Sequence, residues 1–107
     1  MPGVEAKRSP HWPHVRAVWL HQNGRCFHCG SRLHLEVHHT VPFHLCRQFE
    51  LDPDNFVTLC EGPGRECHLH VGHLGNWKTF NPKLIGPAMR RKLRALGIPL
   101  QRLLVAA

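Results

Sequence analysis

Two pairs of cysteines constrain the fold of this chain of 107 residues more than any other feature. Two residues separate Cys26 from Cys29, a spacing from which one tight turn presents two thiolates to a tetrahedral zinc ion. Six residues separate Cys60 from Cys67, a longer interval, and Gly62-Pro63-Gly64 within it provides slack for a wider loop. A chain this short buries only a modest core and gains from a metal staple. The sequence therefore predicts a structural Zn²⁺ site formed by Cys26, Cys29, Cys60 and Cys67.

The fifth cysteine and the compartment belong to the same interpretation. Cys46 lies between the two pairs; we expect it to be free, and its replacement of Cys67 as a ligand is the alternative. The first residues, Met1 to Arg8, lack the apolar core of a secretory signal, so we expect a cytoplasmic protein. Reducing surroundings favour metal-bound or free thiols over disulfides. The chain contains no apolar run of membrane-spanning length, and we expect no membrane partner.

Histidines suited to hydrolysis stand among these cysteines. Phosphodiester cleavage needs a base for water, which a histidine of near-neutral pKa can provide. It also needs a Lewis acid, which a divalent cation can provide. We take His39 as the candidate general base, and His38 and His68 as candidate ligands of a catalytic Mg²⁺, Mn²⁺ or other divalent ion. Asn55 is the candidate support, whose amide would hold the loop backbone that orients His39.

Two geometric conditions attach to this site. Neighbours on a regular strand point to opposite faces, so the backbone is expected to leave β geometry around His39-Thr40. On an ideal α-helix His68 and His73 are about 140° apart. His73 is therefore a third ligand only if the helix is irregular at Gly72, and both outcomes stay open. We expect His70 to face solvent or a phosphate. The other histidines lack such a context and are expected at the surface or half-buried: His11, His14, His21, His28, His34 and His44.

Periodicity predicts a helix followed by a hairpin in the first part of the chain. Ser9-Pro10 starts a helix that runs to about Gln22, with a buried stripe of Trp12, Val15 and Trp19. Alternation over 33–37 predicts a first strand, and the apolar run 55–60 predicts a second. A long loop over 43–53 would join them.

The second part of the chain is predicted to be helical. A helix is expected from about Cys67 to Leu74, and Pro87 and Gly97 bracket another. Met89, Leu93 and Leu96 form the apolar face of this second helix, and Pro99 opens a last apolar segment. Trp77 and Phe80 are expected to cover the core.

Charge is distributed unevenly along the chain. The formal net charge is +7, yet six of the seven acidic residues lie between Glu36 and Glu66. From Cys67 to the end there are seven lysines and arginines and no acidic residue. Such a basic segment favours a polyanionic partner, although a merely solubilising surface would give the same count. The candidate nucleic-acid contacts are Lys78, Arg90, Arg91, Lys92 and Arg94.

Taken together, these residues resemble the HNH endonucleases, in particular the compact free-standing type of bacteria and their phages. About two thirds of the chain takes part in the resemblance. Its segments are Arg8-Ser9-Pro10 with Trp12-Pro13, the Cys26/Cys29 turn, Leu35 to His39, Val41 to His44, Leu51 to Asn55, Thr58 to Glu61, Cys67 to Leu69, Gly72 to Gly75, and Trp77 to Pro82.

The resemblance implies an α+β fold with a small ββα-metal (His-Me finger) core, a structural zinc knuckle and flanking helices. It also implies a helix placed in the DNA minor groove, one divalent ion held by His38 and His68, His39 as base, Asn55 as support, and products with 5′-phosphate and 3′-hydroxyl ends. The chain departs from the family pattern in the long Cys60–Cys67 interval and at Gly72, where many relatives carry a second helix histidine.

We therefore expect a single domain over 1–107, with an N-terminal helix in 1–25, the zinc and ββα-metal core in 26–82 and a basic helical extension in 83–107. The expected function is that of a metal-dependent endonuclease acting on double-stranded DNA, as a monomer or weak homodimer. The alternative is a non-catalytic, zinc-dependent nucleic-acid-binding protein, and the sequence does not decide between DNA and RNA.

Overall fold

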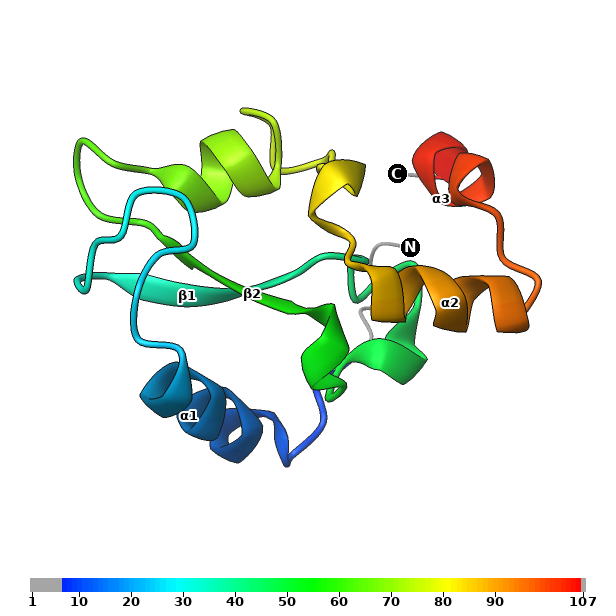
Figure 1. Cartoon of the computed structure of the whole chain (residues 1–107), viewed down its shortest axis with the longest axis horizontal. Helices are drawn as coiled ribbons and strands as arrows, with labels where there is room; N and C mark the ends of the chain where they lie inside the picture. Colours follow the sequence, from blue (N-terminus) through cyan, green and yellow to red (C-terminus); the bar gives the residue numbers. More distant parts are fainter. Residues whose placement is uncertain (1–6, 107) are drawn as a thin grey trace.

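The computed structural model describes residues 7–106, without the side chain of Ala106, and its fold is α+β (Figure 1). Most of the segment expected to lack a secretory signal, residues 1–6, lies outside this range. Within it, no helix has both the length and the apolar character that a membrane span requires. The elements in chain order are α1 (Trp12–Gln22), β1 (Leu35–His39), η1 (Arg47–Phe49), η2 (Pro53–Asn55), β2 (Phe56–Cys60), η3 (His68–Gly72), η4 (Pro82–Leu84), α2 (Pro87–Ala95) and α3 (Leu100–Ala106).

The antiparallel hairpin of β1 and β2 forms the centre of the molecule. Leu35 pairs with Cys60 at one end and His39 with Phe56 at the other. The first strand therefore runs two residues beyond the predicted 33–37, and the Thr40 amide extends the pairing by donating to the carbonyl of Asn55 at 2.8 Å. The backbone was expected to leave β geometry around His39-Thr40, and it does so at Thr40, while His39 is still paired.

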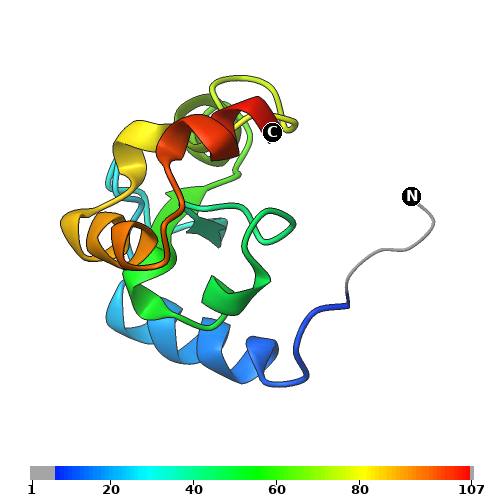
Figure 2. The ribbon, with the colours of Figure 1, turned by 90° about the vertical axis from the view of Figure 1, so that its right-hand side faces the viewer.

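Helix α1 covers one side of the hairpin and η3 the other (Figures 1 and 2). Trp12 and Trp19 pack edge-on against Phe56, with ring centroids 5.5 and 5.4 Å apart. The indole of Trp19 also donates to Thr58 Oγ1 at 3.0 Å. Both tryptophans are only half-buried, so the predicted stripe does meet the sheet but is not fully enclosed.

A second apolar cluster holds the carboxy-terminal helices against the loop between the strands. Val41 and Phe49 of that loop pack with Phe80, with Met89 and Leu93 of α2, and with Leu103 of α3. Cys46 is buried in the same cluster, away from the other four cysteines. The long loop is thus fixed by packing, and Phe80 covers the core as expected.

Two apolar residues assigned to the core lie at the surface. Trp77 is 54% exposed and Leu96 is 55% exposed. Leu96 sits at the C-cap of α2, one residue beyond the helix, so the apolar face that Met89 and Leu93 begin does not reach it.

We predict a large difference between two truncations on α2. Met89→Ala removes a fully buried side chain and should lower the free energy of unfolding by about 2–5 kcal/mol. Leu96→Ala is the matched control and should change it by no more than about 0.5 kcal/mol. Urea denaturation followed by circular dichroism measures both; equal effects would contradict the packing described here.

Candidate metal centres

The side chains of Cys26, Cys29, Cys60 and Cys67 converge at one end of the hairpin. Their sulfur atoms all lie within 4.8 Å of one another, so the quartet could hold a metal ion. Cys29 Sγ and Cys60 Sγ are 3.7 Å apart, far beyond the length of a disulfide. A tetrahedron with Zn–S bonds of about 2.3 Å has S···S edges of about 3.8 Å. The donor set and spacing therefore fit zinc.

Local turns create this convergence. The Cys26 carbonyl accepts from the Gly30 amide at 2.9 Å, and Gly30 has a φ of +78°, which closes the first turn without strain. The Phe27 amide donates to the Thr58 carbonyl at 2.8 Å, which joins the turn to β2.

The second pair depends on the turn Gly62-Pro63-Gly64-Arg65. The Arg65 amide donates to the Gly62 carbonyl at 3.1 Å, and Gly64 has a φ of +80°, as position three of a type II turn requires. This turn folds the long interval back, so that Cys67 reaches the quartet after all.

The pKa values of two of these thiols are shifted in opposite directions. A backbone hydrogen bond at Ser31, helped by the neighbouring thiols, lowers the pKa of Cys29 to about 6. Burial raises the pKa of Cys67 well above its usual range. Four thiols this close cannot all ionise unless a positive charge lies between them.

A second cluster lies on the η3 side of the hairpin, where His38, His68 and His73 converge. One ring nitrogen from each lies within 4.8 Å of the others, and the ring centroids are 5.1, 4.9 and 5.0 Å apart, a nearly equilateral triangle. This group too could hold a metal ion. The third position, left open by the sequence, is thus occupied by His73.

Hydrogen bonds orient two of these rings. Nδ1 of His68 lies 2.7 Å from Glu61 Oε1, and Nδ1 of His73 lies 2.7 Å from the Thr79 carbonyl. Because a carbonyl oxygen only accepts, Nδ1 of His73 carries the proton and Nε2 keeps its lone pair. Carboxylate or carbonyl groups behind a ligating imidazole are typical of metal sites.

His38 provides the test of whether a cation fits. Its Nε2 is the one buried side-chain nitrogen or oxygen in the described part of the chain without a hydrogen-bond partner. An orphan of this kind destabilises the fold by about 1–3 kcal/mol, a penalty that a bound cation would remove. Burial, and next the neighbouring His68 and His73, lower the pKa of His38 to about 2, so the ring is neutral as a ligand must be.

The geometry of η3 explains why His73 joins. The sequence predicted a helix from about Cys67 to Leu74; the structure has a shorter one, η3, and it is a π-helix. Its hydrogen bonds span five residues instead of four, so residues five apart come to lie nearly one above the other. Asn81 stabilises the irregular turn, because its amide groups donate to the Gly72 and Val71 carbonyls at 2.9 and 3.0 Å.

Gly72 allows η3 to approach the hairpin closely. A Cβ at this position would meet His38 Nδ1 and Leu59 Cδ1 at 3.0 Å each. Close packing therefore accounts for a glycine at position 72, and His73 follows it directly.

His39 lies on the opposite face of β1 from His38. Its ring packs 4.7 Å from that of Trp12, and its Nε2 lies 2.9 Å from the Glu50 carbonyl. Nε2 must donate to that oxygen, so Nδ1 is the basic nitrogen. Burial lowers the pKa of His39, while the Glu50 carbonyl opposes this effect.

Asn55 is fully buried and holds the loop that carries Glu50. Its Oδ1 accepts from Thr40 Oγ1 and the Val41 amide, both at 2.7 Å. Its Nδ2 donates to the carbonyls of Val41 and Phe49 at 3.1 and 3.3 Å. The side chain thus has the supporting contacts that the sequence suggested.

A cavity of about 240 Å³ connects these parts. His38, His68 and His73 line it, and so does His39, the last residue of β1. Arg8 and Lys78 also line the cavity and provide positive charge. Two histidines that the sequence did not assign to the site lie in different places. His44 lines the cavity, whereas His70 is exposed beside Glu66.

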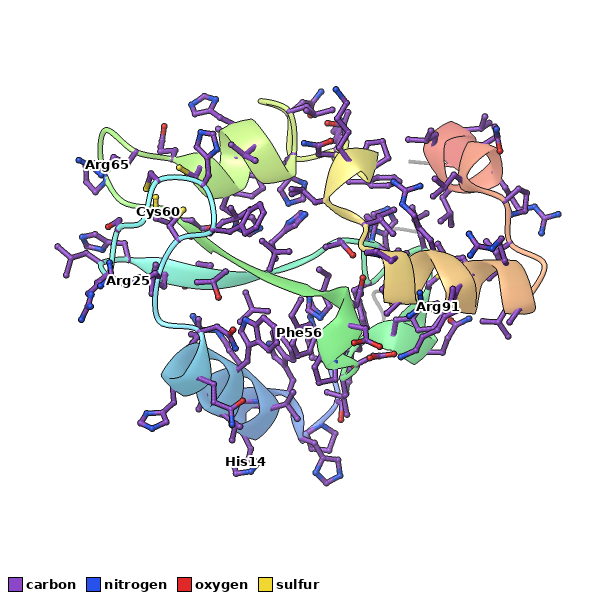
Figure 3. The ribbon with its side chains drawn as sticks, viewed as in Figure 1. His14, Arg25, Phe56, Cys60, Arg65 and Arg91 are labelled. Carbon is purple, nitrogen blue, oxygen red and sulfur yellow. The ribbon has the colours of Figure 1, made fainter. Side chains whose placement is uncertain are left out.

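The predicted nucleic-acid contacts divide into two groups. Lys92 pairs with Asp52 and Asp54, which raise its pKa, and Arg90 donates to the Ile85 and Pro82 carbonyls at 2.9 Å each. Both are therefore engaged within the fold. Lys78, Arg91 and Arg94 are exposed, and Figure 3 labels Arg91 on α2.

Sequence reasoning missed the residues that support the site. Glu61 directly follows a candidate zinc ligand, a position that could have suggested its role beside His68. Arg8 pairs with the buried Glu50 at 3.8 Å and lies over the Phe43 ring. No local pattern indicates that contact or the one between Thr79 and His73.

Comparison with protein-family models, with characterised proteins and with solved structures found no match. The function has to be inferred from the motif residues and the geometry of the site.

We predict that Glu61 strengthens metal binding at the three histidines. Trp77 lies 5.1 Å from His68 and 4.8 Å from His73 between ring centroids, so bound Ni²⁺ should quench its fluorescence. Glu61→Gln should weaken Ni²⁺ binding about 10- to 100-fold. Glu66→Gln, which alters an exposed carboxylate near His70, is the control and should leave affinity unchanged. Trp77→Phe should abolish the quenching signal; equal affinities for both glutamate variants would exclude the role of Glu61.

Proposed function

We propose that this chain is a metal-dependent endonuclease that hydrolyses phosphodiester bonds of DNA, with a ββα-metal core. The observation that carries the proposal is one cavity lined both by a three-histidine cluster and by a fourth histidine with a free basic nitrogen. The resemblance of the motif residues to HNH endonucleases supports the same reaction.

In this proposal His39 takes the proton from the attacking water through Nδ1. The Glu50 carbonyl accepts a hydrogen bond from Nε2 of His39. Burial lowers the pKa of His39, so its ring is neutral and can accept a proton. Asn55 is a positioning residue, because its hydrogen bonds hold the loop that carries the Glu50 carbonyl. It does not touch the reacting atoms.

His38, His68 and His73 would hold the divalent ion. When bound, the ion supplies a Lewis acid that neutralises charge on the phosphoryl oxygens and assists the departing alkoxide. Arg8 and Lys78 provide further positive charge in the cavity and would steer the phosphate towards it.

The ligand type leads to a prediction about the ion. Three imidazoles favour first-row transition ions, whereas Mg²⁺ prefers oxygen ligands. Cleavage should therefore be faster with Mn²⁺ or Ni²⁺ than with Mg²⁺ at equal concentration. Rates on plasmid DNA, measured with each ion added to metal-depleted protein that retains its thiolate zinc, provide the test; the opposite order would argue against an all-histidine site.

Substitution of the base tests the reaction itself. His39→Ala should reduce cleavage by about 10²–10⁴. His14→Ala is the control, because this exposed residue lies on α1 and points away from the hairpin (Figure 3). Undiminished cleavage in His39→Ala would remove this residue from its role. Salt-sensitive DNA binding without cleavage under any ion would favour the alternative, a non-catalytic nucleic-acid-binding protein, and cleavage of RNA alone would change the substrate.

The two candidate metal centres should respond differently to chelation. Mild EDTA treatment should stop cleavage while circular dichroism stays unchanged, because the thiolate site is closed and binds more tightly. Cys26→Ser should instead cause loss of the folded state. Simultaneous loss of fold and activity on mild chelation would contradict two separate sites.

A further inference from the structure

A groove at the thiol end of the molecule has no role in the proposed reaction. Its volume is about 450 Å³, and no carboxylate side chain lines it. Figure 3 shows Arg65 at this end, near the sulfur atoms of the quartet around Cys60, with Arg25 on the other side of them. We name it the knuckle groove; its lining residues are Ser31, Arg32, Leu33, His34, Cys60, Gly62, Pro63 and Arg65.

Two arginines from different loops line this groove. Arg32 follows the first cysteine turn, and the rigid turn over 62–65 presents Arg65. Both side chains are exposed, and neither has an ion-pair partner among residues 7–106. Arg16 and Lys92, by contrast, are paired with carboxylates. The groove therefore carries positive charge that the fold leaves unused.

The backbone of His34 in the groove is held in an unusual conformation. Its φ is +55°, uncommon for a residue other than glycine. The Glu61 amide donates to its carbonyl at 2.8 Å, and its ring packs so closely on Gly62 that a Cβ there would lie 2.8 Å from Cδ2. Strained residues that the surroundings hold in place gather at binding sites.

We propose that the knuckle groove binds a phosphate of the nucleic-acid backbone, through the guanidinium groups of Arg32 and Arg65. The guanidinium fork matches phosphate geometry and stays charged at all relevant pH values. The choice of DNA as the ligand rests on the proposed function, whereas the role of the groove is in binding and not in cleavage.

The position of the groove indicates which phosphate it would contact. Four residues, 35–38, lie between His34 and His39, and the five steps along the chain correspond to roughly 17 Å at about 3.3 Å per residue. Phosphates along one strand follow each other at about 3.4 Å of helix axis. The bound phosphate would therefore lie several nucleotides from the scissile bond, and the groove would set the direction of the DNA across the cavity.

Charge balance at the thiols is the competing explanation for the arginines. Zinc with four thiolates keeps two negative charges, which nearby cations could offset. The test must therefore measure zinc content together with DNA binding.

The experiment uses full-length, zinc-loaded protein carrying His39→Ala, so that DNA is not cut, and a fluorescent 20-base-pair duplex over a series of KCl concentrations. Arg32→Gln with Arg65→Gln should weaken binding roughly tenfold and reduce the salt slope by about 1–2, with zinc content unchanged. Arg102→Gln, an exposed arginine of α3 at the opposite end (Figure 1), is the control and should change neither. Lysine at positions 32 and 65 should restore most of the salt slope.

Three outcomes would overturn the proposal. They are an unchanged salt slope with full zinc content, loss of zinc in the glutamine variant, and binding of inorganic phosphate that depends on the two arginines while duplex affinity does not. Cleavage kinetics of the arginine variant with His39 intact distinguish the groove proposal from the nuclease proposal. Unchanged kcat with raised KM supports the groove, whereas absence of cleavage in the parent chain would refute only the nuclease.

Discussion

Convergence of the four thiols determines where the histidine site can form. Cys60 and Cys67 each precede a residue of that site, Glu61 and His68, in the chain. Drawing the two sulfur atoms together therefore brings the carboxylate to the imidazole, at 2.7 Å. The turn over 62–65 allows this in spite of the long interval between the cysteines. The segment 60–68 thus links both candidate metal centres, and a displacement of Cys60 or Cys67 would also displace Glu61 and His68.

Adjacent histidines on opposite faces of a strand can serve one cavity only at the end of that strand. His38 turns towards η3, whereas His39 turns towards Trp12 and the Glu50 carbonyl. Strand β1 ends at His39, and one cavity is lined by both histidines. Asn55 makes this arrangement rigid. Its four hydrogen bonds hold both ends of the loop, which would otherwise lose the carbonyl that orients His39.

The parts of the site that follow from local chemistry could be predicted from the sequence. The cysteine spacing, the adjacent histidines and Asn55 are recognisable because each lies in a short stretch of sequence. In the structure the four thiols converge, His38 joins the histidine cluster, and Asn55 binds the loop backbone. The third histidine could not be placed, since an ideal α-helix of 3.6 residues per turn separates His68 from His73. The π-helix that unites them depends on Gly72 and on Asn81, ten residues beyond the carbonyl it binds at Val71. Similarly, Trp77 and Leu96 were expected in the core because they are apolar. A side chain is buried only where another part of the fold packs against it, and both residues are exposed. Lys92 looked free because its partner Asp52 is distant in sequence, and Arg90 looked free because its partners are backbone carbonyls, which no charge pattern indicates.

The two candidate centres differ in the property that separates structural from catalytic metal sites. The thiol quartet presents four protein donors and is largely buried, so an ion there has its full tetrahedral set. The histidine cluster presents three donors and borders a cavity, which leaves a position for water or a phosphate oxygen. Thiolates are soft ligands and imidazoles intermediate ones, so the two sites also prefer different ions. Because the histidine cluster takes His68 from the residue after Cys67, zinc at the thiols would fix the position of one of its three ligands. Loss of that zinc would therefore weaken binding of an ion at the histidines, whereas the thiol quartet contains no residue of the histidine cluster.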